Sequence, residues 1–406
     1  MSGDRIIAGI QKSPAYQSAV QSLDRDHDRF VNEIVALTEI PAPPFGEEKR
    51  GLAWRALLAG SGLTDIETDA EGNVMGLRRG TGAPGGKLVV ISAHLDTVFP
   101  AGVDVKVKRQ GTRLSAPGIG DDSRGLAALL AYARALDAGQ VETKSDILFV
   151  ATVGEEGPGD LRGMRYFFTK GPYRNRVAAF FSLDGIDPSR VTNGAVGSKR
   201  YRVTFKGPGG HSFGAFGIVN PMVAMSKAVT DLYEVVPPTN PKTTFAAAVT
   251  GGGTSVNSIP DSAYMEFDMR SESAVELAGL EKRFLAIIDK AVAGENAARS
   301  TRAGSITADK KQIGDRPAGM TAAHADIVTL TAAAAKAQGY RPQFNASSTD
   351  ANMPISLGIP AVTIGSGGRG DRAHAPDEFI DVEKGESVKG LTVGLLALIA
   401  TANAQP

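Results

Sequence analysis

The sequence predicts an α/β fold in which a larger domain with a mostly parallel central sheet is interrupted by a smaller α+β domain. Short apolar runs typical of buried strands alternate with helical segments in the first half of the chain. From about Gly197 the strands acquire one polar face, and Ala-rich helices and short apolar strands resume from about Arg316. A chain of 406 residues is also too long for one compact domain. We expect residues 1–198 and 315–406 to form the larger domain and residues 199–314 the insert.

The expected elements of the larger domain follow from apolar periodicity and from residues that break helices. Helices are expected over 22–37, before the Pro-rich segment 41–44, over 47–59, before Gly60, and over 124–136, which is rich in Ala and Leu. Strands are expected over 73–79, 87–93, 146–153, 177–183 and 359–364. The first two strands are joined by a Gly-rich turn at 80–86.

The insert has a different pattern. Residues 199–206 (KRYRVTFK) alternate polar and apolar side chains, which predicts a strand with one face in solvent. A helix near 221–233, strands near 243–250 and 262–270, a helix over 274–293 and a last strand within 302–310 follow. Open-faced strands combined with helices are typical of an α+β domain.

Composition excludes several classes of protein. The 44 basic and 44 acidic residues cancel, whereas a nucleic-acid-binding domain normally has a basic excess. Because the chain has no Cys, a metal site has to use His, Asp and Glu. We find no run of 18 apolar residues and no signal-peptide core at the N-terminus. We therefore expect a cytoplasmic protein without membrane or nucleic-acid partners, although removal of a leader peptide would be compatible with export.

Acidic residues or His follow the ends of the expected strands. Strand carboxyl ends are where α/β sheets bind ligands, and carboxylates crowded there repel each other unless a cation neutralises them. Taken singly, each residue has a simpler explanation, such as a helix cap, a solvated loop or a turn. Together they predict a metal site. The residues are His94, Asp96, Asp121, Asp122, Glu155, Glu156, Asp184 and His374.

These side chains suit Zn²⁺, with Mn²⁺ or Co²⁺ as alternatives. Two His and at least three carboxylates are enough for two ions that share one carboxylate. This is the arrangement used by metal-assisted hydrolases.

The motifs that carry these residues resemble the co-catalytic zinc exopeptidases, which include peptidase T, carboxypeptidase G and succinyl-diaminopimelate desuccinylase. SAHLDTV, GIGDDSRG, TVGEEGPGD, SLDG and GGRGDRAHAPDEF occur in the order of that family, and the resemblance covers nearly the whole chain from about residue 30. It implies a zinc-exopeptidase-like catalytic domain, interrupted by an insert that serves as lid and dimerisation domain.

The resemblance also implies which residues bind two zinc ions. His94 and Asp184 would bind one metal. Glu156 and His374 would bind the other, and Asp121 would bridge the two.

Three further residues would act in catalysis. Glu155 would be the general base that deprotonates the water between the metals, and Asp96 would hold His94 in the required tautomer. In the insert, KGPGGHS resembles the lid motif of the family. This implies that His211 stabilises the oxyanion in the active site of the partner subunit of a homodimer. Without the resemblance, a His after two glycines would be interpreted as a turn residue.

Asn257 and Arg270 also match lid positions, where they would bind polar groups and a carboxylate of the substrate. Alternatively, Arg270 pairs with Asp268 or Glu266. Six arginines close to the motifs suggest a substrate with acidic groups, such as Asp or Glu peptides or oligomers of aspartate. The alternative is that these arginines pair with local carboxylates. They are Arg124, Arg162, Arg165, Arg270, Arg369 and Arg372.

Two motifs depart from the family pattern. Ser123 occupies the third position of the family's Asp-x-Lys-Gly pattern and is followed by Arg124, so the role of that Lys has no assigned residue here. Residues 347–352 read SSTDAN, close to the Gly-Gly-Thr-Asp pattern of peptidase T. These departures leave the subfamily open.

The combined prediction is a homodimeric di-zinc exopeptidase, either an aminopeptidase or a carboxypeptidase, that cleaves an amide bond at the end of short peptides. A deacylase or desuccinylase of acylated amino acids is the alternative within the family, because the reaction is the same. A non-catalytic binding protein on the same fold is an alternative from another class, and the complete set of ligands disfavours it.

Overall fold

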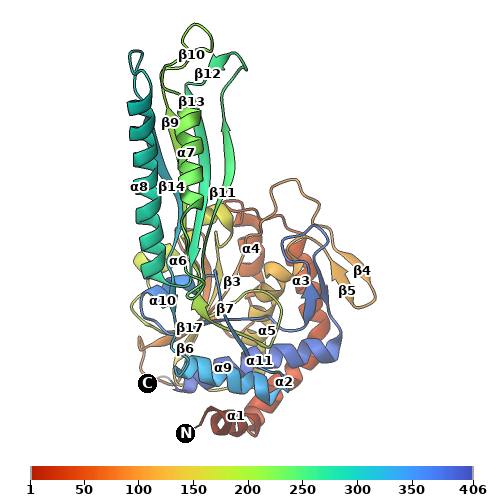
Figure 1. The fold of residues 1–406 in the computed structure, drawn as a ribbon. Helices are drawn as coiled ribbons and strands as arrows, with labels where there is room; N and C mark the ends of the chain where they lie inside the picture. Colours follow the sequence, from red (N-terminus) through yellow and green to blue (C-terminus); the bar gives the residue numbers. More distant parts are fainter. Residues whose placement is uncertain (1, 405–406) are drawn as a thin grey trace. The chain divides into compact units, whose positions relative to one another are not determined.

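The computed structural model describes residues 2–404, which divide into two compact units (Figure 1). Unit 1 contains the described residues up to Ala195 and from Met320 onward, and unit 2 is Val196–Gly319. The expected domain boundaries at 198/199 and 314/315 fall inside strands β9 (Gly197–Lys206) and β14 (Thr307–Arg316). These two long strands begin and end unit 2, so its limits lie at their outer ends.

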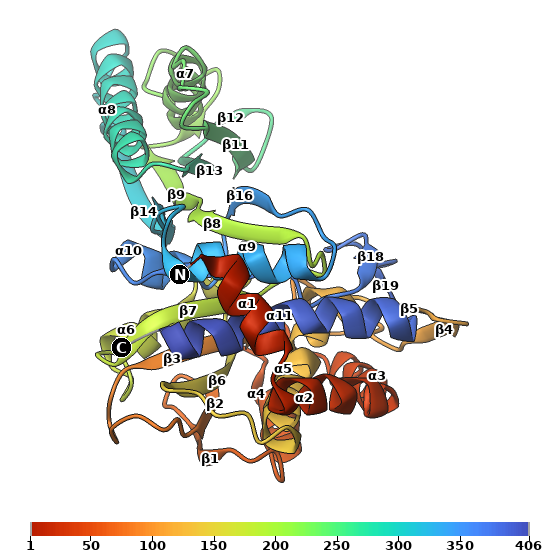
Figure 2. The same ribbon diagram turned by 90° about the horizontal axis from the view of Figure 1, so that it is seen from below.

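Within residues 2–404, unit 1 is built on a nine-stranded sheet of order β1-β2-β6-β3-β7-β17-β8-β15, with β16 paired to β8 (Figure 2). The central strands β6, β3, β7 and β17 are parallel, whereas β2 and β8 run antiparallel to their central neighbours. The sheet is therefore mixed: its centre is parallel, and antiparallel strands flank that centre, as is common in α/β folds. The strands are β1 (Thr64–Thr68), β2 (Val74–Arg78), β3 (Leu88–His94), β6 (Asp146–Thr152), β7 (Val177–Leu183), β8 (Arg190–Ala195), β15 (Gly319–Met320), β16 (Gln343–Ser347) and β17 (Ala361–Ile364).

Helices cover both faces of this sheet, which explains why its central strands are apolar throughout. Alternate residues of β3 point to opposite faces: Val89 and Ile91 pack in one apolar cluster, and Leu88 and Val90 in the other. The first face is covered by α5 (Arg124–Ala138), α9 (Asp326–Ala337) and α11 (Lys384–Ala404), and the second by α6 (Arg162–Thr169) and α10 (Asn352–Ser356). Outside them lie α1 (Gly3–Gln11), α2 (Pro14–Arg25) and α3 (His27–Thr38), whereas α4 (Glu48–Leu57) packs on β2.

Helix α11 is long and apolar enough to cross a membrane, with a mean hydropathy of 1.4 over its most apolar window. However, 83% of that window is buried inside the protein. Its position in the core of unit 1 accounts for its composition.

Two sequence-based expectations for unit 1 need correction. The single helix expected over 22–37 is the end of α2 followed by α3, with Asp26 between them at φ −94° and ψ 14°. A small sheet of order β18-β19-β5-β4 was not expected, because three-residue strands carry too little periodicity to predict. Its strands are β4 (Lys108–Gln110), β5 (Arg113–Ser115), β18 (Arg369–Asp371) and β19 (Phe379–Asp381).

Unit 2 is an antiparallel four-stranded sheet, of order β11-β13-β9-β14, covered by two helices. Its other strands are β11 (Thr243–Gly252) and β13 (Ser262–Ser271). A separate short antiparallel pair is formed by β10 (Gly210–His211) and β12 (Ser258–Ile259). The helices α7 (Pro221–Tyr233) and α8 (Ala274–Ala298) pack their apolar faces on buried side chains of β9 and β13. The α+β character expected for the insert is confirmed. Three details differ: β14 starts at Thr307 and continues to Arg316, α8 extends to Ala298, and the short pair β10/β12 was not expected.

Candidate metal centre

The neighbouring parallel strands β6, β3 and β7 all end on the same side of the sheet in unit 1, so their carboxyl ends lie next to each other. His94 is the last residue of β3 and is paired in register with Thr152, the last residue of β6. Glu155 and Glu156 follow β6 after a turn, and Asp184 directly follows β7. Parallel pairing therefore brings side chains from three distant segments to one place, as expected for an α/β sheet.

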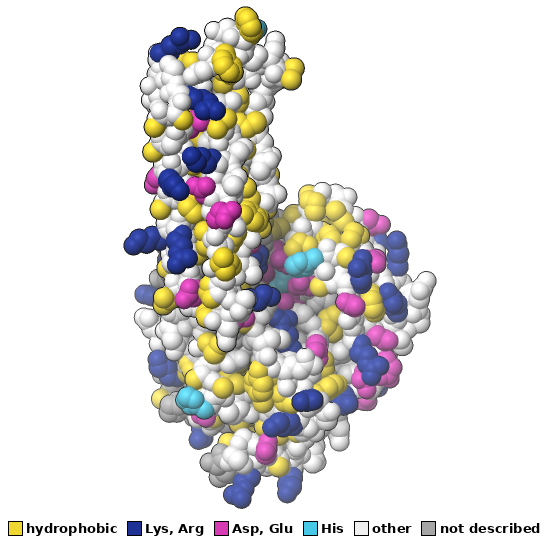
Figure 3. Space-filling view, in the orientation of Figure 1, with side chains coloured by type: hydrophobic (Ala, Val, Ile, Leu, Met, Phe, Trp, Pro, Cys, Tyr) yellow, Lys and Arg dark blue, Asp and Glu magenta, His cyan; other side chains and the backbone are white. Residues whose placement is uncertain are grey.

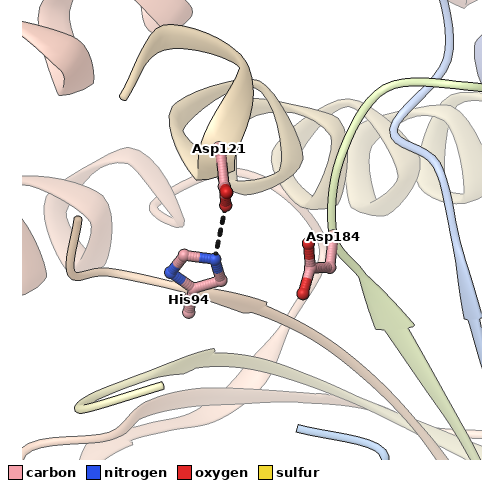
Figure 4. Close-up of side chains that lie close together, drawn as sticks. All are labelled: His94, Asp121 and Asp184. Carbon is pink, nitrogen blue, oxygen red and sulfur yellow. Dashed lines mark hydrogen bonds and ion pairs between the residues drawn. The ribbon is translucent and has the colours of Figure 1, made fainter. Parts of the chain in front are cut away.

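Two groups of possible ligands share Asp121. His94 Nε2 lies 2.8 Å from Asp121 Oδ1, and Asp184 completes the first group (Figure 4). His374 Nε2 lies 3.0 Å from Asp121 Oδ2 and 3.0 Å from Glu156 Oε1, which form the second group. The two carboxylate oxygens of Asp121 thus face different histidines. Within each group one nitrogen or oxygen atom of each residue lies within 4.8 Å of the others.

The donor set fits divalent cations. Ligands at about 2.0–2.2 Å from a tetrahedral ion lie about 3.3–3.6 Å apart, close to the separations seen here. Burial alone would lower the pKa of the His94 imidazole, but its hydrogen bond to Asp121 and the surrounding carboxylates raise it well above the usual value. Hydrogen bonds with Asp121 and Glu156 raise the pKa of His374 to about 11. Carboxylates that hold a proton on imidazole so strongly also attract a metal cation, which would compete with that proton.

The Asp184 carboxyl shows the same crowding of negative charge. Burial, and next the charge of Asp121, raise its pKa to about 6.

The group that contains His374 is open to solvent. The side chain of His374 is 55% exposed, so a ligand can reach it. Figure 3 shows a His beside acidic side chains on the surface of unit 1.

Asp96 contacts His94 through its backbone carbonyl rather than through its carboxylate. His94 Nδ1 lies 2.9 Å from the backbone carbonyl oxygen of Asp96, whereas the carboxylate is 3.7 Å away. Because a carbonyl oxygen only accepts, Nδ1 carries a proton, and Nε2 would become free to bind a metal ion once it gives up the proton that it shares with Asp121. The Asp96 carboxylate instead accepts the backbone N–H groups of Glu155 (3.0 Å) and Glu156 (2.8 Å). It holds the loop that carries both glutamates.

Three more buried carboxylates surround the centre. Asp122 accepts the backbone N–H of His94 at 3.0 Å, and Asp350 accepts the hydroxyl of Thr152 at 2.5 Å. Glu378 accepts backbone N–H groups of the loop that carries Asp121. Asp350 lies in the motif at 347–352, for which the sequence predicted no role. Glu378 was not predicted, although it lies in the same motif as His374.

The six arginines that suggested an acidic substrate are buried or paired with carboxylates of the protein. They therefore do not support a preference for acidic substrates. Arg124 is fully buried, 5.2 Å from the centre of the Phe30 ring, and burial lowers its pKa to about 10. The other five form ion pairs with local carboxylates: Arg162 with Glu47 and Glu71, Arg165 with Asp160, Arg270 with Asp268, Arg369 with Glu386 and Arg372 with Asp377.

Two of the expected lid residues lie together at one end of unit 2. His211 pairs with Ser258, next to Asn257, and its Nδ1 accepts backbone N–H groups of Phe213 (3.3 Å) and Gly214 (3.2 Å). Phe213, Phe216 and Val256, which lie close to His211 or Asn257 in the sequence, are exposed. Figure 3 shows apolar side chains at the tip of the unit. Arg270 lies at the far end of β13, opposite Ser198 of β9. Unit 2 therefore does not bring the three residues together.

The fold and these two adjacent groups of ligands define a two-unit α/β protein with a candidate dinuclear metal centre. The family model described as Peptidase family M20/M25/M40 matches residues 90–398, which is more than half of the chain. The chain belongs to this family.

Known relatives agree with this assignment. Succinyl-diaminopimelate desuccinylases from Burkholderia vietnamiensis and Burkholderia multivorans are 26% and 28% identical, over 54% and 56% of this chain. These matches span 62% and 64% of the relatives' own length.

Solved structures share the fold. Aminopeptidase PepT from Bacillus cereus has a TM-score of 0.74 at 21% identity, covering 92% of this chain and 99% of that chain. A dinuclear metal-binding peptidase of the M20 family from Bacillus subtilis has a TM-score of 0.67 at 19% identity, covering 93% and 99%.

Proposed function

We propose that the protein is a hydrolase that uses two divalent metal ions to cleave an amide bond at the end of a short peptide. The observation that carries this proposal is Asp121, whose two oxygens face His94 and His374 in adjacent groups of ligands. Zinc is the ion that best suits these ligands, with manganese and cobalt as possible substitutes. Two ions held there would supply Lewis acidity and make a water molecule nucleophilic at neutral pH.

The chain's own residues would divide the remaining work. His94 and Asp184 would hold one ion, Glu156 and His374 would hold the other, and Asp121 would contribute a carboxylate oxygen to each site. Glu155, which is buried and lies close to His94 and Glu156, takes the proton of the attacking water and passes it to the leaving amine.

His211 would donate a hydrogen bond to the oxyanion. Its Nδ1 accepts two backbone N–H groups, so Nε2 carries the proton and is a donor. By resemblance to the family, we propose that His211 acts in the partner subunit of a homodimer formed through unit 2, where Asn257 binds a polar group of the substrate. Arg270 would bind a substrate carboxylate at a separate place, and only in exchange for its ion pair with Asp268.

Mixing two inactive variants tests the action of His211 in trans. Heterodimers of His211→Ala with Glu155→Gln contain one active site with both residues intact, so they should regain up to about half the wild-type rate. After complete exchange of equal amounts, about half of the dimers are heterodimers, so the mixture should reach up to about a quarter of the wild-type rate. No recovery in confirmed heterodimers would place His211 in its own subunit's site or outside catalysis.

A deacylase of acylated amino acids is the alternative, favoured by the similarity to desuccinylases. Incubation with an unlabelled tripeptide and with an N-succinyl amino acid, followed by mass spectrometry, distinguishes the two. A terminal amino acid released from the tripeptide supports the peptidase and shows which end is cleaved. Succinate released without tripeptide cleavage would establish the deacylase.

A further inference from the structure

One buried carboxylate ties the loop of Asp121 to the segment that follows His374. Glu378 is 1% exposed, and its Oε1 accepts the N–H groups of Gly120 (2.7 Å) and Asp121 (2.8 Å). Its Oε2 accepts the N–H of Gly118 at 2.9 Å. These partners lie 257 to 260 residues away in the sequence, so the three bonds join segments that are otherwise distant.

Glu378 is itself fixed by its backbone. Its N–H donates to the carbonyl of Ala375 (3.0 Å), closing a turn directly after His374, and its carbonyl accepts the N–H of Ala116 (3.0 Å). The chain continues into β19, which pairs with β5. His374 has a φ of 66°, a left-handed conformation that few residues other than Gly adopt and that the surrounding structure has to stabilise. The turn that ends at Glu378 is part of those surroundings.

Glycines leave room for this carboxylate. A Cβ at Gly120 would lie 3.1 Å from Glu378 Oε1 and 2.7 Å from Ile186 Cδ1. Gly118 has a φ of 73°, which turns its N–H toward the same side chain. The Gly-Ile-Gly sequence before Asp121 therefore allows three N–H groups to converge on one buried acceptor.

We propose that Glu378 is a positioning residue that fixes the Asp121 carboxylate relative to His374, and so sets the affinity of the ion held by Asp121, Glu156 and His374. The inference rests on the proposed function, because it requires that this group binds an ion. The other group depends less on Glu378, since His94 and Asp184 are placed by β3 and β7.

Calorimetric titration of metal-free protein with Zn²⁺ tests the proposal. The wild type should bind two ions. In Glu378→Gln, the ion held by Asp121, Glu156 and His374 should bind about 10- to 100-fold more weakly, as for other residues that support metal ligands. The ion held by His94 and Asp184, which shares Asp121 but is placed mainly by β3 and β7, should be weakened less. Substrate hydrolysis by this variant should require a correspondingly higher Zn²⁺ concentration, and its rate should recover when Zn²⁺ is saturating. Glu383→Gln is the matched control, because Glu383 also accepts two backbone N–H groups but is exposed.

Gly120→Ala provides an independent variant, since its new Cβ presses on the same hydrogen bonds. It should weaken binding of the ion held by Asp121, Glu156 and His374 in the same way, and it tests the proposal even if Glu378→Gln fails to fold. Two ions bound with wild-type affinity in either folded variant would overturn the role of Glu378. A wild type that binds no Zn²⁺ would instead overturn the proposed function itself.

Discussion

Replacing Glu155 with Gln should remove turnover while leaving metal binding intact. Gln keeps the size of the side chain but cannot take a proton from water, and general-base catalysis contributes about 10²–10⁴-fold to the rate. The loop stays in place because Asp96 holds the backbone N–H of residue 155, which the substitution retains. Rate measurements on a peptide substrate, with metal content by mass spectrometry, check both halves of this expectation.

Glu142→Gln is the matched control for this substitution, because Glu142 is an exposed residue of unit 1 and should be neutral. If Glu155→Gln lost an ion along with activity, Glu155 would be a ligand, and its role and that of Glu156 would have to be exchanged. Normal turnover in the variant would show that another group acts as the base.

Replacing Asp121 with Ala should have a larger effect, because this side chain belongs to both groups of ligands. We expect weakened binding of both ions and a loss of activity of about 10³-fold or more, since a bound metal supplies several kcal/mol of charge stabilisation. His374→Ala removes a ligand from one group only and should leave one ion bound. Comparing the metal content of the two variants by mass spectrometry tests whether Asp121 is shared.

Asp377→Ala controls for the removal of a carboxylate near the centre, because the Asp377 side chain is 68% exposed and pairs with Arg372. It should bind two ions. If Asp121→Ala kept one ion at full affinity, Asp121 would serve one metal, and the bridging role would be wrong.

The sequence predicted the fold where apolar periodicity is long enough to define an element. The strands β3, β6 and β7 and the helices α7 and α8 were placed to within a few residues. Three-residue strands such as β18 and β19 have no such periodicity, yet they carry the chain on both sides of His374. β19 pairs with β5, where Ile380 lies opposite Leu114, and β18 pairs with β19; no local pattern encodes this pairing.

For the candidate site, the sequence predicted which side chains gather but not how they are held. His94 and Asp121 belong to motifs that could be recognised, and parallel strands place such motifs at one edge. The contacts of Asp96 and Glu378 depend on which backbone N–H groups point inward, and this is decided by three-dimensional packing. The arginines show the same limit, because their nearest carboxylates come from distant segments as often as from neighbouring residues.

The most direct test of a two-metal centre is to remove the metal and restore it in steps. Protein treated with a chelator and dialysed should be inactive on a tripeptide or an N-acyl amino acid. Adding Zn²⁺ should restore hydrolysis, with full activity at two ions per chain. Full activity in verified metal-free protein, or recovery complete at one ion per chain with no second ion bound, would contradict the two-metal centre.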